Sequence, residues 1–113
     1  GATTVEMNDK EMIYEASAEM MKEIIERNNI DKDDIVSIVF TATSDLDKAY
    51  PAVAVRQMGI TEAALMCVQE MNVESSLRKC IRVVVTLEGN YDRKNINHAY
   101  LRGAVVLRPD LKK

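Results

Sequence analysis

The sequence is poor in the residues that build metal sites, disulfide frameworks and phosphate loops. Its 113 residues include one histidine, two cysteines, four glycines and two prolines. A single histidine, His98, excludes a histidine-rich metal site, and the spacing of Cys67 and Cys80 fits no zinc-finger pattern. Neither a glycine-rich phosphate loop nor a Ser/His/Asp motif is found. The low glycine and proline content also excludes a low-complexity chain.

Excess basic charge and long apolar runs are missing as well. Lys and Arg number 15 against 18 Asp and Glu, which gives a net charge of −3. A general nucleic-acid binder carries a basic face, so we expect no nucleic-acid partner, although a local pocket for a small anion remains allowed. We expect no membrane partner either, because no run is long enough to span a bilayer and no signal peptide is recognised. Reduced cysteines and a cytoplasmic location are the resulting expectation.

The hydrophobic pattern predicts one α+β domain with a modest core. Apolar residues repeat at helical spacing over Asp9–Asn28, where Asn8 and Glu11 resemble a capping box. A second, shorter helix is predicted over Pro51–Met58, because it begins with proline and ends before Gly59. Strands are predicted at residues 34–43, 63–69 and 80–87, with a short final strand within 96–107.

This order of elements predicts a sheet covered on one face by the two helices. The other face of the sheet would then be apolar and uncovered in a single chain. Such a face calls for a partner, and oligomerisation would also help a domain with so small a core.

Two charged residues stand among apolar neighbours. Arg82 lies in the middle of a valine-rich strand, and Glu70 follows the strand before it. A buried guanidinium is costly unless it meets an anion. In one interpretation Arg82 forms a structural salt bridge with Glu70 or reaches solvent. In the other, both face one polar ligand, with Glu70 accepting a hydrogen bond from a hydroxyl and Arg82 meeting an oxygen. The residues alone leave both open.

The remaining candidates are weaker when taken one at a time. Cys67 is not expected to be a nucleophile, because nothing places His98, the only histidine base, beside it. A buried cysteine usually acts as a small hydrophobe. Arg56, Arg108 and Tyr100 can ring a carboxylate-binding pocket, but each alone is more often a solvated surface residue.

Five groups of segments resemble, in chain order, the motifs of one enzyme family. They are Gly1–Glu6, Thr41–Leu46 with Tyr50–Ala52, Cys67–Met71, Cys80–Val83, and Tyr100–Leu101 with Ala104–Leu111. On these motifs the sequence resembles the AroH-class chorismate mutases over essentially its whole length.

The resemblance implies a mixed sheet with helices on its outer face, and three subunits that form a pseudo-α/β-barrel. It implies a homotrimer with an active site between neighbouring subunits. The reaction implied is the rearrangement of chorismate to prephenate in aromatic amino-acid biosynthesis, with no cofactor and no metal. In the family, a strand ending in a carboxylate-binding arginine precedes the first motif. We therefore expect residues 1–113 to be a single chorismate-mutase domain that lacks this first strand.

The resemblance also implies roles for individual residues. Arg82 corresponds to the catalytic arginine aimed at the breaking ether oxygen, and Glu70 to the glutamate that binds the ring hydroxyl. The implied substrate-binding residues are Arg56, Cys67, Tyr100, Arg108, Tyr50 and Leu107. Two positions depart from the family, because Tyr50 replaces a frequent phenylalanine and Val53 replaces a lysine found in some members.

Such an intramolecular rearrangement needs no nucleophile, metal or redox cofactor. The protein has to hold the reactive diaxial conformer and stabilise the negative charge that grows on the ether oxygen. Two alternatives stay open. One is a trimeric small-molecule-binding or regulatory module without catalysis, which the missing upstream arginine favours. The other is a member of the trimeric imine-deaminase family, against which the Cys67–Met71 and Leu107–Leu111 motifs argue.

Overall fold

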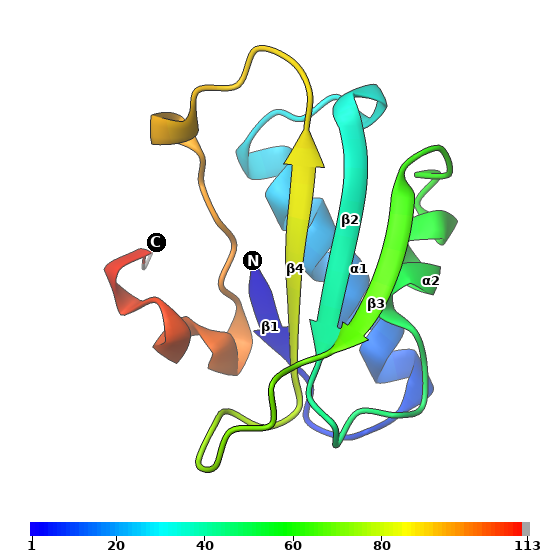
Figure 1. The fold of residues 1–113 in the computed structure, drawn as a ribbon, viewed down its shortest axis with the longest axis vertical. Coiled ribbons are helices and arrows are strands. Elements are labelled where there is room, and N and C mark those ends of the chain that lie inside the picture. Colours follow the sequence, from blue (N-terminus) through cyan, green and yellow to red (C-terminus); the bar gives the residue numbers. More distant parts are fainter. Residues whose placement is uncertain (112–113) are drawn as a thin grey trace.

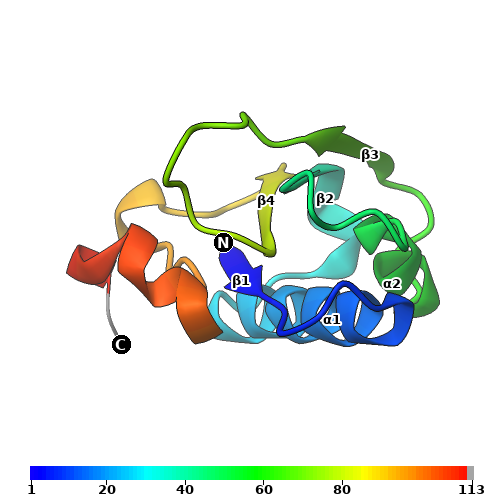
Figure 2. The ribbon, with the colours of Figure 1, turned by 90° about the horizontal axis from the view of Figure 1, so that it is seen from below.

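The protein folds as a four-stranded mixed sheet with two helices packed on one face (Figure 1, Figure 2). The computed structural model describes residues 1–111. The elements are β1 (Ala2–Thr4), α1 (Lys10–Arg27), β2 (Ile35–Ala42), α2 (Pro51–Gln57), β3 (Ala64–Gln69) and β4 (Cys80–Leu87). The sheet order is β1-β4-β2-β3, and β2 runs parallel to β3 but antiparallel to β4. The predicted mixed sheet with two helices is confirmed.

Helix α1 begins at a different cap from the one predicted. Asp9 is the N-cap, because its carboxylate accepts a hydrogen bond from the backbone N–H of Met12 at 3.1 Å. Asn8 instead holds the loop after β2, where its side-chain amide donates to the carboxylate of Asp47 at 2.7 Å. The predicted apolar stripe of α1 is buried: Ile13, Ala16, Met20 and Ile24. In the described part of the chain, no helix is both long and apolar enough to cross a membrane.

The core lies between the two helices and the inner face of the sheet. Phe40 of β2 and Ile81 of β4 are fully buried there, together with Val55 of α2. Because side chains alternate along a strand, the residues next to Phe40 and Ile81 point to the opposite face.

No helix lies over that opposite face, called here the open face (Figure 2). It carries exposed apolar side chains. Val39 of β2 lies between Met66 of β3 and Val84 of β4 in the sheet register. Met66 and Val84 are 58% and 67% exposed. The chain therefore exposes the apolar sheet face that the sequence predicts, in a form suited to a further contact.

At one end of the chain the structure has a strand that the sequence does not predict, and at the other it lacks one that the sequence predicts. Ala2–Thr4 forms β1, which the sequence pattern does not predict, because three residues are too few to show a period. This strand exists through its antiparallel pairing with β4, where Ala2 lies opposite Arg82. The predicted final strand within 96–107 is wrong. Tyr100 makes one isolated parallel bridge to Ala2, and the backbone then turns into 3₁₀ helices at Arg102–Leu107 and Pro109–Leu111.

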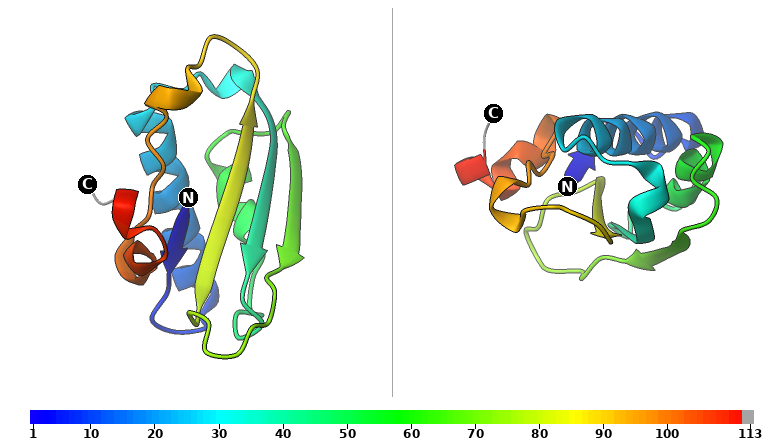
Figure 3. Two further views of the ribbon diagram at one scale, coloured as in Figure 1. Left: turned by 60° about the vertical axis from the view of Figure 1, so that its left-hand side comes forward. Right: turned by 90° about the horizontal axis from the view of Figure 1, so that it is seen from above.

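The tail, residues 102–111, lies beside β1 (Figure 3). It leaves the extended path at Arg102, whose φ of 52° is in the left-handed region. Two contacts hold its start. The backbone N–H of Gly103 donates to Thr4 Oγ1 at 3.0 Å, and Arg102 forms an ion pair with Glu19 of α1 at 3.1 Å.

Candidate active site

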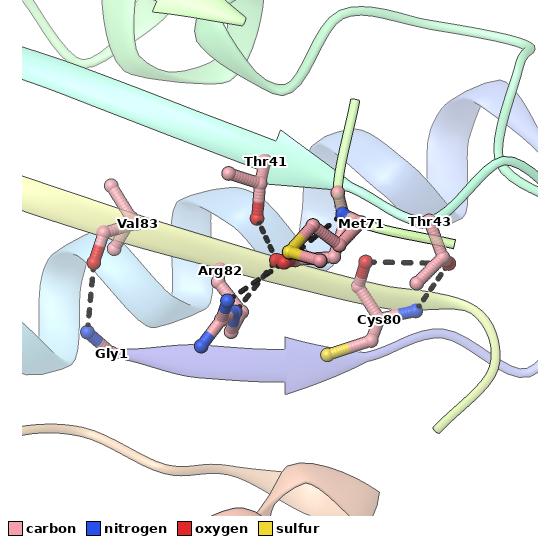
Figure 4. Close-up of polar contacts among 8 residues, drawn as sticks. Gly1, Thr41, Thr43, Met71, Cys80, Arg82 and Val83 are labelled. Carbon is pink, nitrogen blue, oxygen red and sulfur yellow. Dashed lines mark hydrogen bonds and ion pairs between the residues drawn. The ribbon is translucent and has the colours of Figure 1, made fainter. Parts of the chain in front are cut away.

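Arg82 and Glu70 form a two-pronged ion pair on the open face (Figure 4). Arg82 Nε donates to Glu70 Oε1 and Arg82 Nη2 donates to Glu70 Oε2, each at 2.7 Å. Strand β4 places Arg82 on this face because its neighbours Ile81 and Val83 point into the core. The Arg82 side chain is 50% exposed rather than buried, since no helix covers that side of the sheet.

Further donors hold the Glu70 carboxylate in its ionised form. Thr41 Oγ1 donates to Oε1 at 2.6 Å, and the backbone N–H of Met71 donates to Oε2 at 3.3 Å. The hydrogen bond from Arg82 is the largest cause that lowers the pKa of Glu70, and together these contacts bring it to about 2. The same bond raises the pKa of Arg82. Both groups are therefore fixed charges at neutral pH.

Tyr100 and Arg108 extend this charged region. Tyr100 bridges to Ala2, the residue opposite Arg82 in the register, and its phenol lies near enough to raise the pKa of Arg82 slightly. Arg108 in the tail pairs with Asp110 at 3.0 and 2.9 Å, which is the main reason that the pKa of Arg108 is raised, and Tyr100 adds to it. Leu107 precedes Arg108 and is partly exposed.

Tyr50 and Cys67 lie elsewhere. Both line a hollow of about 480 Å³ between the start of α1, the loop before α2, and β3. Cys67 lies opposite Phe40 in the register, so its side chain is on the helix-covered face, and β2 separates its strand from that of Arg82. A single chain therefore does not bring these two residues to the Arg82–Glu70 pair. Tyr50 is 70% exposed at the rim.

The other sequence candidates are placed as follows. Arg56 is exposed on the last turn of α2, and Val53 is half-buried on the same helix. Both cysteines are free, and burial raises the pKa of the Cys80 thiol to about 11. His98 lines a separate hollow with Tyr100 rather than the one that contains Cys67. Within residues 1–111, no cluster of His, Cys, Asp or Glu side chains is arranged to hold a metal ion.

Thr41 is a site residue that sequence reasoning missed. It was visible only as part of the motif Thr41–Leu46, with no role of its own. Its hydroxyl is the signal that could have indicated it, because a polar side chain near the end of the apolar strand β2 has to face a partner or solvent.

The arrangement suits electrostatic binding rather than proton transfer. Arginine has five N–H donors, and Arg82 uses two of them on Glu70, so the other three remain for a ligand oxygen. The guanidinium cannot lose its proton, and the Glu70 carboxylate stays ionised from neutral pH down to strongly acidic pH. The pair can therefore offer a permanent cation to a developing negative charge.

Comparison with known proteins gives one consistent result. The family described as chorismate mutase type I matches residues 1–111. The chain is 42% identical to chorismate mutase AroH of Bacillus subtilis, over 98% of this chain and 88% of that protein. It is 38% identical to chorismate mutase AroH of Thermus thermophilus, over 99% of this chain and 93% of that protein. A solved chorismate mutase from Clostridium thermocellum superimposes with a TM-score of 0.92 at 49% identity, covering 94% of this chain and 95% of the other.

Proposed function

The chain belongs to the type I chorismate mutase family, isomerases that convert chorismate to prephenate, and from this premise we propose how its own residues perform the reaction. The reaction breaks one C–O bond and forms one C–C bond within a single molecule. The enzyme selects the reactive conformer and stabilises the charge that develops on the ether oxygen. The observation that carries this proposal is the Arg82–Glu70 pair, held by four hydrogen bonds on the open face.

Arg82 is the residue that stabilises the ether oxygen as the C–O bond breaks. Its free N–H donors are already oriented by the pair with Glu70, so little reorganisation is needed during the reaction. A permanently charged guanidinium suits this role because the rearrangement transfers no proton. Glu70 accepts a hydrogen bond from the ring hydroxyl of the substrate and balances the charge of Arg82.

The remaining residues hold the substrate in the compact conformer. The two substrate carboxylates are bound by Arg108, Tyr100 and Arg56, which supply charged or hydroxyl donors. Tyr50, Cys67 and Leu107 contact the ring. Because conformer selection is a matter of position, small shifts in these residues lower the rate even without loss of a charge.

Each active site lies between two subunits of a homotrimer. Two observations support this proposal. The open face exposes apolar side chains of β3 and β4, and the Tyr50–Cys67 hollow is separated from Arg82 by β2. A site that combines both groups needs a second subunit. A cytoplasmic location and the absence of a nucleic-acid partner remain predictions from the sequence.

Loss of chorismate absorbance, with the product identified as prephenate, tests the function directly. We would assay the chain as printed and the same chain extended by the strand and arginine that the resemblance implies before Gly1. Prephenate formation by either protein supports the proposal. If both are folded and neither forms prephenate, the chain is a binding module and the proposal is wrong.

Arg82→Ala tests the central residue. We expect a loss of about 3 kcal/mol of transition-state stabilisation, or roughly 100-fold in kcat, because an oxyanion donor is removed. Arg82→Lys is the matched control: it keeps the charge but loses the fork, so its loss should be smaller. Unchanged turnover in Arg82→Ala would remove Arg82 from the mechanism.

A further inference from the structure

Thr41 occupies the point where three strands meet the site. It lies on β2, the strand between β3 and β4, directly opposite Arg82 on one side and Val68 on the other. Glu70 follows β3 and is anchored through its backbone N–H, which donates to the carbonyl of Ala42 at 2.9 Å. To reach Arg82, the Glu70 carboxylate has to extend from the β3 side of the sheet, across β2, to β4. The Thr41 hydroxyl contacts the carboxylate on the way, because it donates to Glu70 Oε1 at 2.6 Å (Figure 4).

The backbone anchor does not fix the carboxylate group itself. The last torsion of a glutamate side chain has a broad energy profile, so the plane of the carboxylate is set by its hydrogen bonds. Glu70 Oε1 accepts from Thr41 Oγ1 at 2.6 Å and from Arg82 Nε at 2.7 Å. A two-pronged arginine–carboxylate contact needs the two planar groups aligned. The Thr41 hydroxyl fixes one oxygen from a rigid, central strand and so favours that alignment.

We propose that Thr41 is a positioning residue for the mutase reaction, whose hydroxyl orients the Glu70 carboxylate and, through it, the guanidinium of Arg82. This inference rests on the proposed function of the Arg82–Glu70 pair. Thr41 acts through Glu70 and is not assigned any contact with the substrate.

The hydroxyl, not the shape of the side chain, is the important part. Threonine and valine are both β-branched, and both suit a strand equally in packing terms. Thr41 is half-buried, and its O–H can only donate to Glu70 because an ionised carboxylate is purely an acceptor. Thr41→Val therefore removes the hydrogen bond while it keeps the branched side chain.

The first test is steady-state kinetics on four variants. We expect Thr41→Val to lower kcat by about 10-fold with a smaller change in KM, since a hydrogen bond to a charged group is lost. Thr41→Ala, a second hydroxyl deletion, should show the same loss, so that one poorly folded variant does not decide the result. Thr41→Ser should stay near the wild type because it keeps the hydroxyl. Thr61→Val is the control at an exposed position in the loop between α2 and β3, where the same exchange should have no effect.

The second test follows the Glu70 carboxyl carbon by NMR titration of protein labelled in glutamate. The Thr41 bond helps to lower the pKa of Glu70, so in Thr41→Val this pKa should rise while the Arg82 bond keeps it below the usual range. A purely structural role would not move it. The proposal is overturned if Thr41→Val matches the wild type in kcat and in the Glu70 titration, or if Thr41→Ser loses as much activity as Thr41→Val.

The proposed mutase function and the positioning role of Thr41 can be contradicted independently of each other. If the wild-type protein forms no prephenate, the proposed function is wrong, and the titration alone decides whether Thr41 orients Glu70. If the wild type is active and Arg82→Ala is not, while Thr41→Val is fully active, the function stands and the role of Thr41 is wrong.

Discussion

The Arg82–Glu70 pair makes the stability of the protein depend on pH in a defined direction. The pKa of Glu70 falls from an ordinary 4.5 to about 2 in the folded chain. Because the folded value is lower, the unfolded chain binds a proton first as the pH falls. The ion pair therefore adds its full stability above about pH 4.5 and loses it as the pH falls to about 2.

We expect Glu70→Gln to be less stable than the wild type at pH 7, and the difference to vanish as the pH falls from 4.5 towards 2. The difference at pH 7 should be about 1 kcal/mol or less, because the half-exposed guanidinium of Arg82 is screened by solvent. Urea unfolding at several pH values measures it. Glu15→Gln, on the exposed side of α1, removes the same charge and serves as the baseline. A difference that is constant over this pH range would contradict the assignment.

Single residues differ in how far the sequence alone could place them. An ion pair between Arg82 and Glu70 was part of one of the two interpretations that the sequence allowed, because each residue is a charge among apolar neighbours. The exposure of Arg82 was not predictable from its own strand, since it depends on where the helices pack. The separation of Cys67 from Arg82 also needed the register between β2 and β3, which sets the face of each side chain.

At the scale of elements, the start of the tail depends on one glycine. A Cβ at Gly103 would lie 2.9 Å from Thr4 Oγ1 and 3.3 Å from Thr4 Cγ2. Gly103→Ala therefore has to push the tail away from β1, and the tail carries Leu107 and Arg108. Overpacking of this kind costs about 1–3 kcal/mol where the neighbours cannot move.

Since Arg108 is proposed to bind a substrate carboxylate, we expect Gly103→Ala to raise KM by about 10-fold and to lower the midpoint of thermal unfolding by several degrees. Thr4→Ala in the Gly103→Ala background removes the crowding atoms, so KM should recover in part despite the lost Gly103–Thr4 hydrogen bond. Steady-state kinetics on the single and double variants checks this. A KM that Gly103→Ala leaves unchanged would mean that the tail contact does not position Arg108.

Helices and strands that are long and periodic were predicted correctly, and the shortest elements without a clear period were not. Helix α1 and strands β2 and β4 lie within a residue or two of their predicted bounds, because each contains enough residues to show a helical or buried-strand pattern. β1 has three residues and is defined by its partner β4. The apolar stretch near Ala104 was taken for a strand because 3₁₀ turns packed on β1 leave the same short-range signal.

At the scale of the whole molecule, the proposed trimer explains why one chain holds the site residues in two separate groups. It holds a charged group of Arg82, Glu70, Tyr100 and Arg108 and, on the other side of β2, a hollow with Tyr50 and Cys67. Neither group alone encloses a substrate. Closing the apolar open face against another copy would bury exposed side chains such as Met66 and Val84, which favours assembly.

Mixed assemblies of two inactive variants test this arrangement. Arg82→Ala removes the guanidinium from the charged group, and Tyr50→Asp places a carboxylate at the rim of the hollow. This carboxylate should repel a dianionic substrate, and because Tyr50 is 70% exposed the change should leave the fold intact. If each site takes Arg82 from one subunit and Tyr50 from its neighbour, random mixing of equal amounts restores about a quarter of the sites. Refolding the two variants together and assaying prephenate formation measures this recovery.

The control mixture combines Arg82→Ala with the double variant that carries both changes. No subunit in it supplies Arg82, so it should stay inactive however the subunits assemble. Recovery in the first mixture and none in the control can arise only if residues from two chains complete one site, because neither variant contains an intact set. Equal inactivity of both mixtures, with subunit exchange shown by mass spectrometry, would place the whole site within one chain and reject the shared-site arrangement.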